Sequence, residues 1–503
     1  MIAPSLDQFL PKYKAGSNQV LFTKIPADLE TPVSLFLKLA NDTDNCFLLE
    51  SVTGGEDRGR YSILGMEPDL IWQCDGNSSF ISWMEGFEQT SLHTPTNEDP
   101  FLSLRTLIKA SAIELPSALP ASSAGLFGYL SYDMVRLVEN LPLHNPDTIG
   151  TPDALLLRPS MVAVLDGVLD ELILVSPVWY NENIEAEKAY VQGFERLEKT
   201  LNKLQRVTFN YSSKYTEPGP SAALVNETPK DEFLAVVEKA KKYIREGDIF
   251  QVVPSQRWKM DFPYPPISLY RALRRTNPSP FMFYFNFGDF QVIGASPEIL
   301  VRVFDNEITI RPIAGTRPRG KTPEEDKELA EELLADEKES AEHLMLLDLG
   351  RNDVGRVSKI GTVKPTEQFV IERYSHVMHI ASNVVGELSE DEDALSALMA
   401  GLPAGTVSGA PKVRAMEIID ELENTKRGVY AGGVGYFSAN GDMDMCIALR
   451  TSVIKNNKLY IQAGGGVVFD SDPEMEWEET VSKSMALRKA AEAAHQFIPD
   501  INE

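Results

Sequence analysis

Two pairs of glutamates, each pair three positions apart, lie in segments whose sequence predicts helices. Glu339 and Glu342 belong to DEKESAEHLMLLDLGRND, and Glu476 and Glu479 belong to DPEMEWEET. Because residues three apart share a helix face, each pair presents two carboxylates in one direction. Two converging pairs would suit a hard cation such as Mg²⁺, which takes oxygen ligands from carboxylates, water and substrate. The spacing alone is also compatible with a solvated acidic face.

Three consecutive glycines, Gly464, Gly465 and Gly466, end a predicted strand just ahead of the second glutamate pair. Without a Cβ, the backbone can approach a ligand closely, and successive N–H groups can form a nest for an anion. A carboxylate held by these N–H groups and by a neighbouring cation would explain why glycines and acids adjoin. A β-bulge or a tight turn is the alternative interpretation.

Other residues suit an anionic ligand or proton transfer. They are Gly315 and Thr316 in PIAGTRPRG, His376 and His379 in RYSHVMHIASNVV, Thr406 in LPAGTVSGAPK and Arg450 in MCIALRTSV. An arginine within an apolar predicted strand often meets a carboxylate, although an ordinary ion pair is an equal alternative. A histidine in an apolar run can transfer protons but is more commonly a core residue. The sequence has neither G-x-G-x-x-G after a strand nor G-x-x-x-x-G-K-[ST], so no nucleotide cofactor is predicted.

Composition limits the partners of the chain. It has 503 residues and a net charge of −26, from 48 basic and 74 acidic residues. This balance argues against nucleic acid and against an anionic membrane as main partner. Three dispersed cysteines predict no disulfide framework. The N-terminal residues lack a signal-peptide pattern, and no apolar run approaches the ~20 residues of a membrane span, so we expect a cytoplasmic protein.

Strands and helices mix along the whole chain. The sequence predicts a hairpin over 159–180, helices over 183–204 and 228–247, a linker rich in Pro, Gly and Ser over 211–227, and strand-rich blocks over 291–320 and 427–466. Thr322 and Glu325 predict a capping box for one helix that runs toward Gly350, and Asp472 with Pro473 predicts the start of the last helix. Strands that come in runs favour an α+β fold with antiparallel sheets.

The ordered motifs resemble those of the chorismate-utilising enzymes, and within them the large subunits (component I) of anthranilate synthases. The matching segments are PIAGTRPRG, AEHLMLLDLGRND, YSHVMH, LPAGTVSGAPK, GVYAGGVGYF and QAGGGVVFDSDPEMEWEET, with FLLESVTGGEDRGRYSILG in the N-terminal half. The resemblance implies an α/β sandwich of two packed antiparallel sheets flanked by helices, with both sequence halves contributing. It implies tryptophan-regulatory elements in 1–210, a linker at 211–227 and a chorismate-binding catalytic region in 228–503.

The resemblance also implies a reaction. Chorismate and ammonia would give anthranilate and pyruvate in an Mg²⁺-dependent first step of tryptophan biosynthesis. By position, Glu342 and Glu479 would bind the metal directly, and Glu339 and Glu476 mainly through water.

The family's substrate and catalytic residues are carried over by position in the same way. The backbone of Gly464, Gly465 and Gly466 would hold a substrate carboxylate, Tyr430 and Arg450 the enolpyruvyl carboxylate, and Gly315 and Thr316 the ring; His379 would serve the aromatising elimination and Thr406 would act in the pocket.

Two positions separate this chain from other branches of the family. Isochorismate and salicylate synthases carry a lysine base where this chain has Gln251, and many aminodeoxychorismate synthases carry a nucleophilic lysine where it has Ala314. Both positions favour anthranilate synthase. Aminodeoxychorismate synthase component I, an enzyme of the folate pathway, stays the alternative.

The resemblance further implies feedback inhibition and a partner. Glu50, Ser51, Pro280, Phe281 and Met282 match the tryptophan-inhibitor site. The sequence has no nucleophilic cysteine in a glycine-rich elbow, so ammonia from glutamine would come from a separate glutamine amidotransferase subunit. A catalytically inactive tryptophan sensor and an acidic interaction scaffold are the non-enzymatic alternatives.

Overall fold

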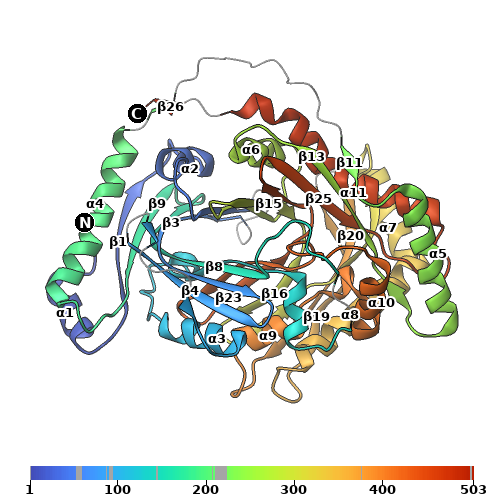
Figure 1. The fold of residues 1–503 in the computed structure, drawn as a ribbon, viewed down its shortest axis with the longest axis horizontal. Coiled ribbons are helices and arrows are strands. Elements are labelled where there is room, and N and C mark those ends of the chain that lie inside the picture. Colours follow the sequence, from blue (N-terminus) through green and yellow to red (C-terminus); the bar gives the residue numbers. More distant parts are fainter. Residues whose placement is uncertain are drawn as a thin grey trace.

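The structure is a computed structural model that describes residues 2–51, 59–85, 88–89, 94–142, 145–206, 208–209, 224–374, 377–498 and 501–502. Strands fill the middle of the molecule, with α1 and α4 along one side and α5 and α11 toward the other (Figure 1). The helices are α1 (Leu6–Lys14), α2 (Pro32–Leu39), α3 (Pro100–Ala110), α4 (Ala186–Arg206), α5 (Lys230–Glu246), α6 (Pro266–Thr276), α7 (Pro323–Ala335), α8 (Glu337–Gly355), α9 (Ala394–Gly401), α10 (Lys412–Leu422) and α11 (Pro473–Ala493), with 3-10 turns η1 (Ala121–Ser123), η2 (Tyr132–Leu137), η3 (Gly405–Val407) and η4 (Ala494–Phe497).

The strands make up the middle of the molecule (Figure 1). They are β1 (Gln19–Pro26), β2 (Cys46–Glu50), β3 (Tyr61–Asp75), β4 (Ser78–Glu85), β5 (Glu88–Gln89), β6 (Thr94–Pro95), β7 (Gly125–Leu130), β8 (Ala154–Asp166), β9 (Glu171–Val178), β10 (Thr208–Phe209), β11 (Val225–Asn226), β12 (Gln251–Val252), β13 (Ser255–Asp261), β14 (Phe281–Asn286), β15 (Phe290–Ser296), β16 (Ile299–Phe304), β17 (Glu307–Ile310), β18 (Ile313–Pro318), β19 (Lys364–Arg373), β20 (Val377–Glu387), β21 (Gly409–Ala410), β22 (Gly433–Ser438), β23 (Met443–Ile447), β24 (Thr451–Lys455), β25 (Lys458–Gly464) and β26 (Ile501–Asn502).

Helix starts follow the predicted caps, with one difference. The Asp472 side chain accepts the Met475 N–H at the start of α11, and Thr322 accepts the Glu325 N–H at the start of α7. In a full capping box the Thr322 N–H would donate to the Glu325 carboxylate. Here the carboxylate accepts the Lys321 N–H instead. The predicted capping box is therefore only half formed.

The prediction of a single helix running toward Gly350 is wrong. The helix is interrupted at Asp336, whose backbone is extended (φ −71°, ψ 111°) between α7 and α8. The Asp336 carboxylate accepts the N–H groups of Lys338 and Glu339, and so it caps the second helix. This cap sets the direction of α8 and thereby the direction in which Glu339 and Glu342 project.

The antiparallel α+β prediction is confirmed. Strand pairs are antiparallel, and both sequence halves contribute to them, since β2 pairs with β14 and β7 pairs with β22. The division into two separate sheets is approximate, because the hydrogen-bonded pairings run continuously from strand to strand. In β3 a register shift between Pro68 and Leu70 marks a bulge, which lets a 15-residue strand bend.

An aromatic core joins the two halves of the chain. Phe47 of β2 stacks on Phe127 of β7 with ring centroids 4.5 Å apart, and Phe285 of β14 lies 5.3 Å from Phe47. These rings are fully buried. Burial of each such side chain stabilises the fold by about 1.5–3 kcal/mol. The N-terminal strands are thus anchored in the same core as β14 and β22 of the C-terminal half.

The other predicted elements lie close to their expected positions. The hairpin is β8 with β9, and the predicted helices are α4 and α5. Most of the predicted linker 211–227 lies outside the described residues, and its last part forms β11, which pairs with β13. Among the residues that the structure describes, no helix combines the length and apolarity needed to cross a membrane.

Candidate active site and regulatory cavity

A cavity of about 600 Å³ collects most of the site residues predicted from the sequence. It lies among α8, α11, β18, β20, β25 and η3. Its lining includes Gly315, Thr316, Glu339, Glu342, His379, Thr406, Tyr430, Arg450, Gly464, Gly466, Glu476 and Glu479. His376 lies outside the described residues.

Gly465 differs from this group. Its N–H donates to the Pro254 carbonyl oxygen at 3.2 Å, so the predicted contact of this N–H with a substrate carboxylate does not hold in this conformation. A different constraint favours glycine at this position, because a Cβ there would lie 3.1 Å from Glu476 Oε2. At Gly466 a Cβ would lie 2.6 Å from Gln251 Nε2. The absence of a side chain at Gly466 therefore leaves room for the Gln251 amide beside the glutamates.

The four glutamates line one cavity, and electrostatic repulsion acts between Glu339 and Glu342, between Glu342 and Glu479, and between Glu476 and Glu479. Burial raises the pKa values of Glu342, Glu476 and Glu339, and the neighbouring Glu342 raises that of Glu339 further. Gln251 Nε2 donates to Glu342 Oε1 at 2.9 Å, and the Oε2 atom of Glu476 is buried without a hydrogen-bond partner. Lys338 and Lys483 offset this rise in pKa only in part for Glu342 and Glu476. Partly buried carboxylates that repel one another fit a hard divalent cation.

The carboxylates are not gathered tightly around one point. Within the described residues, no three acidic, cysteine or histidine side chains lie close enough to hold an ion together. Lys483 Nζ pairs with Glu479 Oε1 at 2.7 Å, which is the helical pair expected from a spacing of four. Binding a metal would require Glu479 to leave this lysine.

His379 lies beside the backbone of β18. Its Nδ1 atom lies 2.8 Å from the Gly315 carbonyl oxygen and 3.1 Å from Thr316 Oγ1. Because a carbonyl oxygen only accepts, we assign the ring proton to Nδ1, which leaves a lone pair on Nε2. Burial lowers the pKa of His379 below its ordinary value. The ring is therefore neutral near pH 7 and able to accept a proton.

The sequence reasoning missed Glu298, in the connection between β15 and β16. Its side chain lines the cavity and accepts a hydrogen bond from Thr406 Oγ1 at 3.1 Å. Burial raises its pKa to about 7. An acidic residue in S-P-E between two apolar strands was the available signal, since a charge is rarely buried there without a function.

Arg450 lies in the bend between β23 and β24, and the prediction that it lies inside a strand is wrong. Its φ of 48° is a left-handed conformation that non-glycine residues rarely adopt. Burial lowers the pKa of this guanidinium, and attraction to the nearby Glu298 carboxyl group offsets part of this effect. Such a cation at the deep end of a cavity is available to an anionic ligand.

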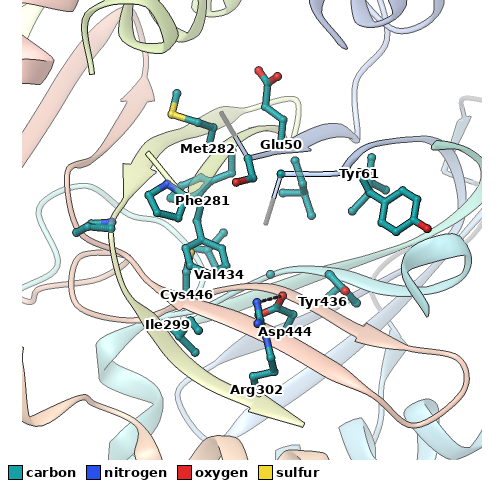
Figure 2. Close-up of a pocket in the computed structure, with 18 of the residues that line it drawn as sticks. Glu50, Tyr61, Phe281, Met282, Ile299, Arg302, Val434, Tyr436, Asp444 and Cys446 are labelled. Carbon is teal, nitrogen blue, oxygen red and sulfur yellow. Dashed lines mark hydrogen bonds and ion pairs between the residues drawn. The ribbon is translucent and has the colours of Figure 1, made fainter. Parts of the chain in front are cut away.

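A second cavity, of about 420 Å³, collects the predicted inhibitor residues (Figure 2). Glu50, Ser51, Pro280, Phe281 and Met282 all lie along it. The sequence did not predict the opposite wall, which is formed by β16, β22 and β23 and carries Ile299, Arg302, Val434, Tyr436, Asp444 and Cys446.

The predicted inhibitor residues point in different directions. The Glu50 carboxylate turns away from the wall formed by β22 and β23 (Figure 2). It accepts hydrogen bonds from Tyr270 and from Arg274, the latter at 2.7 Å. Met282, opposite Glu50 in the β2–β14 pairing, is 1% exposed. Glu50 and Met282 therefore hold the strands in place, whereas Phe281 lies toward Val434.

The two cavities share part of their walls. Pro297 and Ile313 line both of them. Tyr374 lines the second cavity, and its ring lies edge-on to His379 of the first, with centroids 5.5 Å apart. Glu298, between Pro297 and Ile299, faces the first cavity. Residues that line one cavity thus adjoin the acid–base groups that line the other.

Comparisons with known proteins show the family of the chain. Residues 44–489 match the family model described as chorismate binding enzyme. The chain is 62% identical to anthranilate synthase component 1 of Cereibacter sphaeroides, with 98% of each chain covered. It is 48% identical to the component 1 protein of Pseudomonas putida, covering 97% of this chain and 99% of that one. The crystal structure of anthranilate synthase component I from Streptococcus pneumoniae TIGR4 covers 92% of this chain and 99% of its own, at 36% identity and a TM-score of 0.74.

The fold and the matched residues place the chain among the chorismate-binding enzymes. Within them, it belongs to the family of the anthranilate synthase component 1 proteins.

Proposed function

We propose that the chain converts chorismate and ammonia to anthranilate, pyruvate and water, with Mg²⁺ as its metal. The observation that carries this proposal is the polarity of the larger cavity. Four carboxylates from α8 and α11, the Arg450 guanidinium and the glycine backbone at the end of β25 all line it. A dicarboxylate such as chorismate fits this arrangement, with its ring carboxylate toward the metal end and its enolpyruvyl carboxylate toward Arg450 and Tyr430.

Glu342 and Glu479 would hold the metal directly, and Glu339 and Glu476 through water. Bound there, Mg²⁺ would neutralise the ring carboxylate and orient the substrate. The protein's own part is to present these carboxylates from two rigid helices, α8 and α11, whose starts are fixed by Asp336 and Asp472.

Two buried groups suit the proton transfers. Ammonia would add at C2 while the C4 hydroxyl leaves as water, and Glu298, protonated up to about pH 7, would donate the proton to this hydroxyl. Thr406 would hold the Glu298 carboxyl group in place. Nε2 of the neutral His379 would then remove the C2 proton as pyruvate is eliminated, which makes the ring aromatic. Gly315 would hold the imidazole in the required tautomer.

Two lining residues support this branch of the family. Gln251 and Ala314 both line the cavity, so the positions where related synthases carry lysine face the proposed substrate. An amide cannot act as the base for water addition, and a methyl group cannot act as a nucleophile. Ammonia is itself the nucleophile and requires neither group.

The second cavity would bind tryptophan as feedback inhibitor. Its volume, its apolar wall and its shared boundary with the first cavity support this assignment. Residues 1–210 would then supply regulatory elements and 228–503 the catalytic region, joined by 211–227. A glutamine amidotransferase subunit would supply ammonia from glutamine, as the designation component 1 of the relatives suggests.

The test uses the purified chain with chorismate, Mg²⁺ and an ammonium salt at mildly alkaline pH. Anthranilate fluorescence together with pyruvate, lost on adding EDTA, is the expected result. Aminodeoxychorismate as product would overturn the proposed branch, and tryptophan binding without turnover would favour the sensor alternative. Mass spectrometry of the products distinguishes these outcomes.

For His379→Ala, we expect the two chemical steps to separate. Without the base, the aminated non-aromatic intermediate forms but loses pyruvate about 10²–10⁴ times more slowly. Chromatography with mass detection should show this intermediate in place of anthranilate. Undiminished pyruvate release would contradict the assigned role.

For Phe281→Ala, we expect weaker inhibition with an unchanged uninhibited rate. Loss of an aromatic contact of about 1.5–3 kcal/mol should raise the tryptophan inhibition constant by about 10- to 100-fold. Calorimetric titration with tryptophan measures binding directly. Unaltered binding would remove the second cavity from consideration as the inhibitor site.

A further inference from the structure

A third, smaller cavity lies directly behind the candidate active site. It measures about 100 Å³ and is lined by Glu227, Thr228, Glu232, Phe233, Val236, Ser255, Arg257, Leu422, Glu423, Asn424, Thr425 and Gln462. Gln462 also lines the active-site cavity. At the other end, Glu232 and Asn424 are exposed. One side chain thus stands between the active-site cavity and a pocket that reaches the protein surface.

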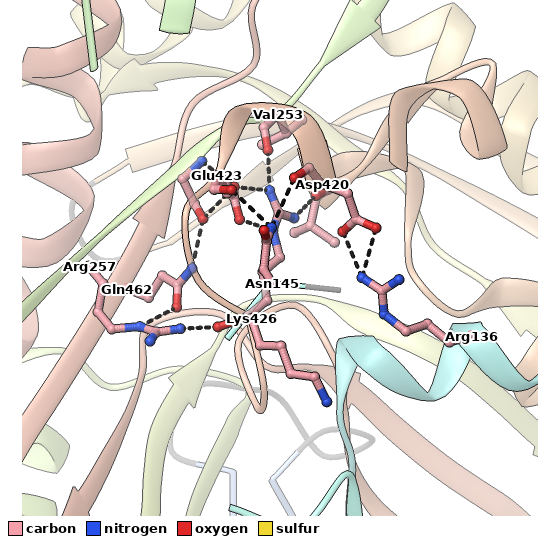
Figure 3. Close-up of polar contacts among 11 residues, drawn as sticks. Arg136, Asn145, Val253, Arg257, Asp420, Glu423, Lys426 and Gln462 are labelled. Atoms are coloured by element: carbon pink, nitrogen blue, oxygen red, sulfur yellow. Dashed lines mark hydrogen bonds and ion pairs between the residues drawn. The ribbon is translucent and has the colours of Figure 1, made fainter. Parts of the chain in front are cut away.

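The partition is held by hydrogen bonds within the β13–β25 ladder. Gln462 is opposite Arg257 and Gly464 is opposite Ser255, so these residues project from the same face. Gln462 Nε2 donates to Ser255 Oγ at 2.8 Å, and its Oε1 accepts from Arg257 Nε at 3.0 Å (Figure 3). For the partition to open, the Gln462 side chain would have to break both hydrogen bonds and turn.

The surrounding wall is fixed by the N-terminal half of the chain. Asn145 Nδ2 donates to the carbonyl oxygens of Asp420 and Glu423, each at 2.9 Å (Figure 3). Arg136 Nη2 binds both carboxylate oxygens of Asp420 at 2.7 and 2.8 Å. These contacts tie the end of α10 to the N-terminal half of the chain, so a passage between the two cavities would require the Gln462 side chain to turn.

The lining is suited to a small hydrogen-bond donor. Glu423 accepts from the N–H and Oγ of Ser255. Within the described residues the buried Oε2 of Glu227 has no hydrogen-bond partner, and Arg257 Nη1 lies 4.0 Å from it. The cavity is much smaller than the 600 Å³ chamber beside it and excludes chorismate and glutamine by size. Ammonia is a donor of the right size, and the proposed reaction consumes it.

A separate route is useful because the substrate occupies the main one. At the metal end of the active-site cavity the Glu479 side chain is 48% exposed, whereas Tyr430 at the deep end is 5% exposed. Chorismate enters from the exposed end and then fills it. We propose that ammonia reaches the bound substrate through the third cavity, past Gln462, which acts as a positioning residue; this inference rests on the proposed function.

The test fills the third cavity without touching the active site. Val236→Trp on α5 and Thr425→Trp after α10 place an indole in it, and Ala235→Trp, on an exposed position of the same helix, is the matched control. We expect both filled variants to raise the KM for NH₃ by about tenfold or more, with the KM for chorismate unchanged. With the partner subunit and glutamine, anthranilate formed per glutamate should fall. The control should match the unmodified chain.

The outcomes separate the two proposals. If folded Val236→Trp and Thr425→Trp keep an NH₃ KM within twofold of the unmodified chain, the passage is refuted and the synthase function stands. If the unmodified chain itself forms no anthranilate from chorismate and ammonia, the proposed function fails. Thermal unfolding of each variant identifies any that misfolds. If one of the two filled variants misfolds, the NH₃ KM of the other tests the passage.

Discussion

Glu342→Gln is expected to reduce anthranilate formation about a thousandfold, because it removes charge at the centre of the electrostatic site. The amide keeps an oxygen that can accept the hydrogen bond from Gln251 Nε2. What it loses is the negative charge that a divalent cation requires. Activity measured over a range of Mg²⁺ concentrations is the primary readout. Glu337→Gln, at an exposed position in the first turn of the same helix, should leave activity unchanged.

Thermal unfolding gives a readout independent of turnover. Burial raises the pKa of Glu342 above its ordinary value of 4.5. The protonated form is therefore favoured in the folded state, and the stability it contributes is lost as pH rises through the folded pKa. At pH 8 without metal, Glu342→Gln should unfold at an equal or higher temperature than the unmodified chain. The upward shift that Mg²⁺ produces in the unmodified chain should disappear. A preserved Mg²⁺ shift would contradict the metal assignment.

The parts of the site that the sequence predicted depend on local patterns. Spacing of three places Glu339 with Glu342, and Glu476 with Glu479, on the same faces of helices that do form. The run of glycines ends β25 beside the cavity, as expected. These features follow from helical periodicity and from the missing Cβ, which neighbouring residues determine.

The parts that were missed depend on contacts between distant segments. Glu298 is buried because η3, more than one hundred residues later, lies over it and supplies Thr406. Gly465 has its N–H taken by Pro254, in the connection before β13. The break at Asp336 is different, because an aspartate that can cap a helix also occurs inside helices, and the local pattern does not decide between the two.

Glu298→Gln is expected to lower kcat about 10²- to 10⁴-fold while the KM for chorismate changes little, because a glutamine cannot donate the proton to the leaving hydroxyl. The pH profile is the sharper test. As Glu298 must be protonated to act and its pKa in the free chain is raised to about 7, kcat/KM for chorismate should fall as pH rises above about 7. The assay should hold the concentration of NH₃ constant, so that titration of ammonium does not contribute.

Thr406→Val distinguishes this acid from any other titrating group. Thr406 Oγ1 donates to Glu298 Oε2, and this bond lowers the pKa of Glu298. Its removal should raise that pKa and move the fall in kcat/KM to higher pH, which a merely structural role of Thr406 would not do. Glu298→Gln should also stabilise the fold above pH 7, because ionisation of a buried carboxyl group costs stability as pH rises through its folded pKa. A pH profile unchanged in both variants would remove Glu298 as the acid.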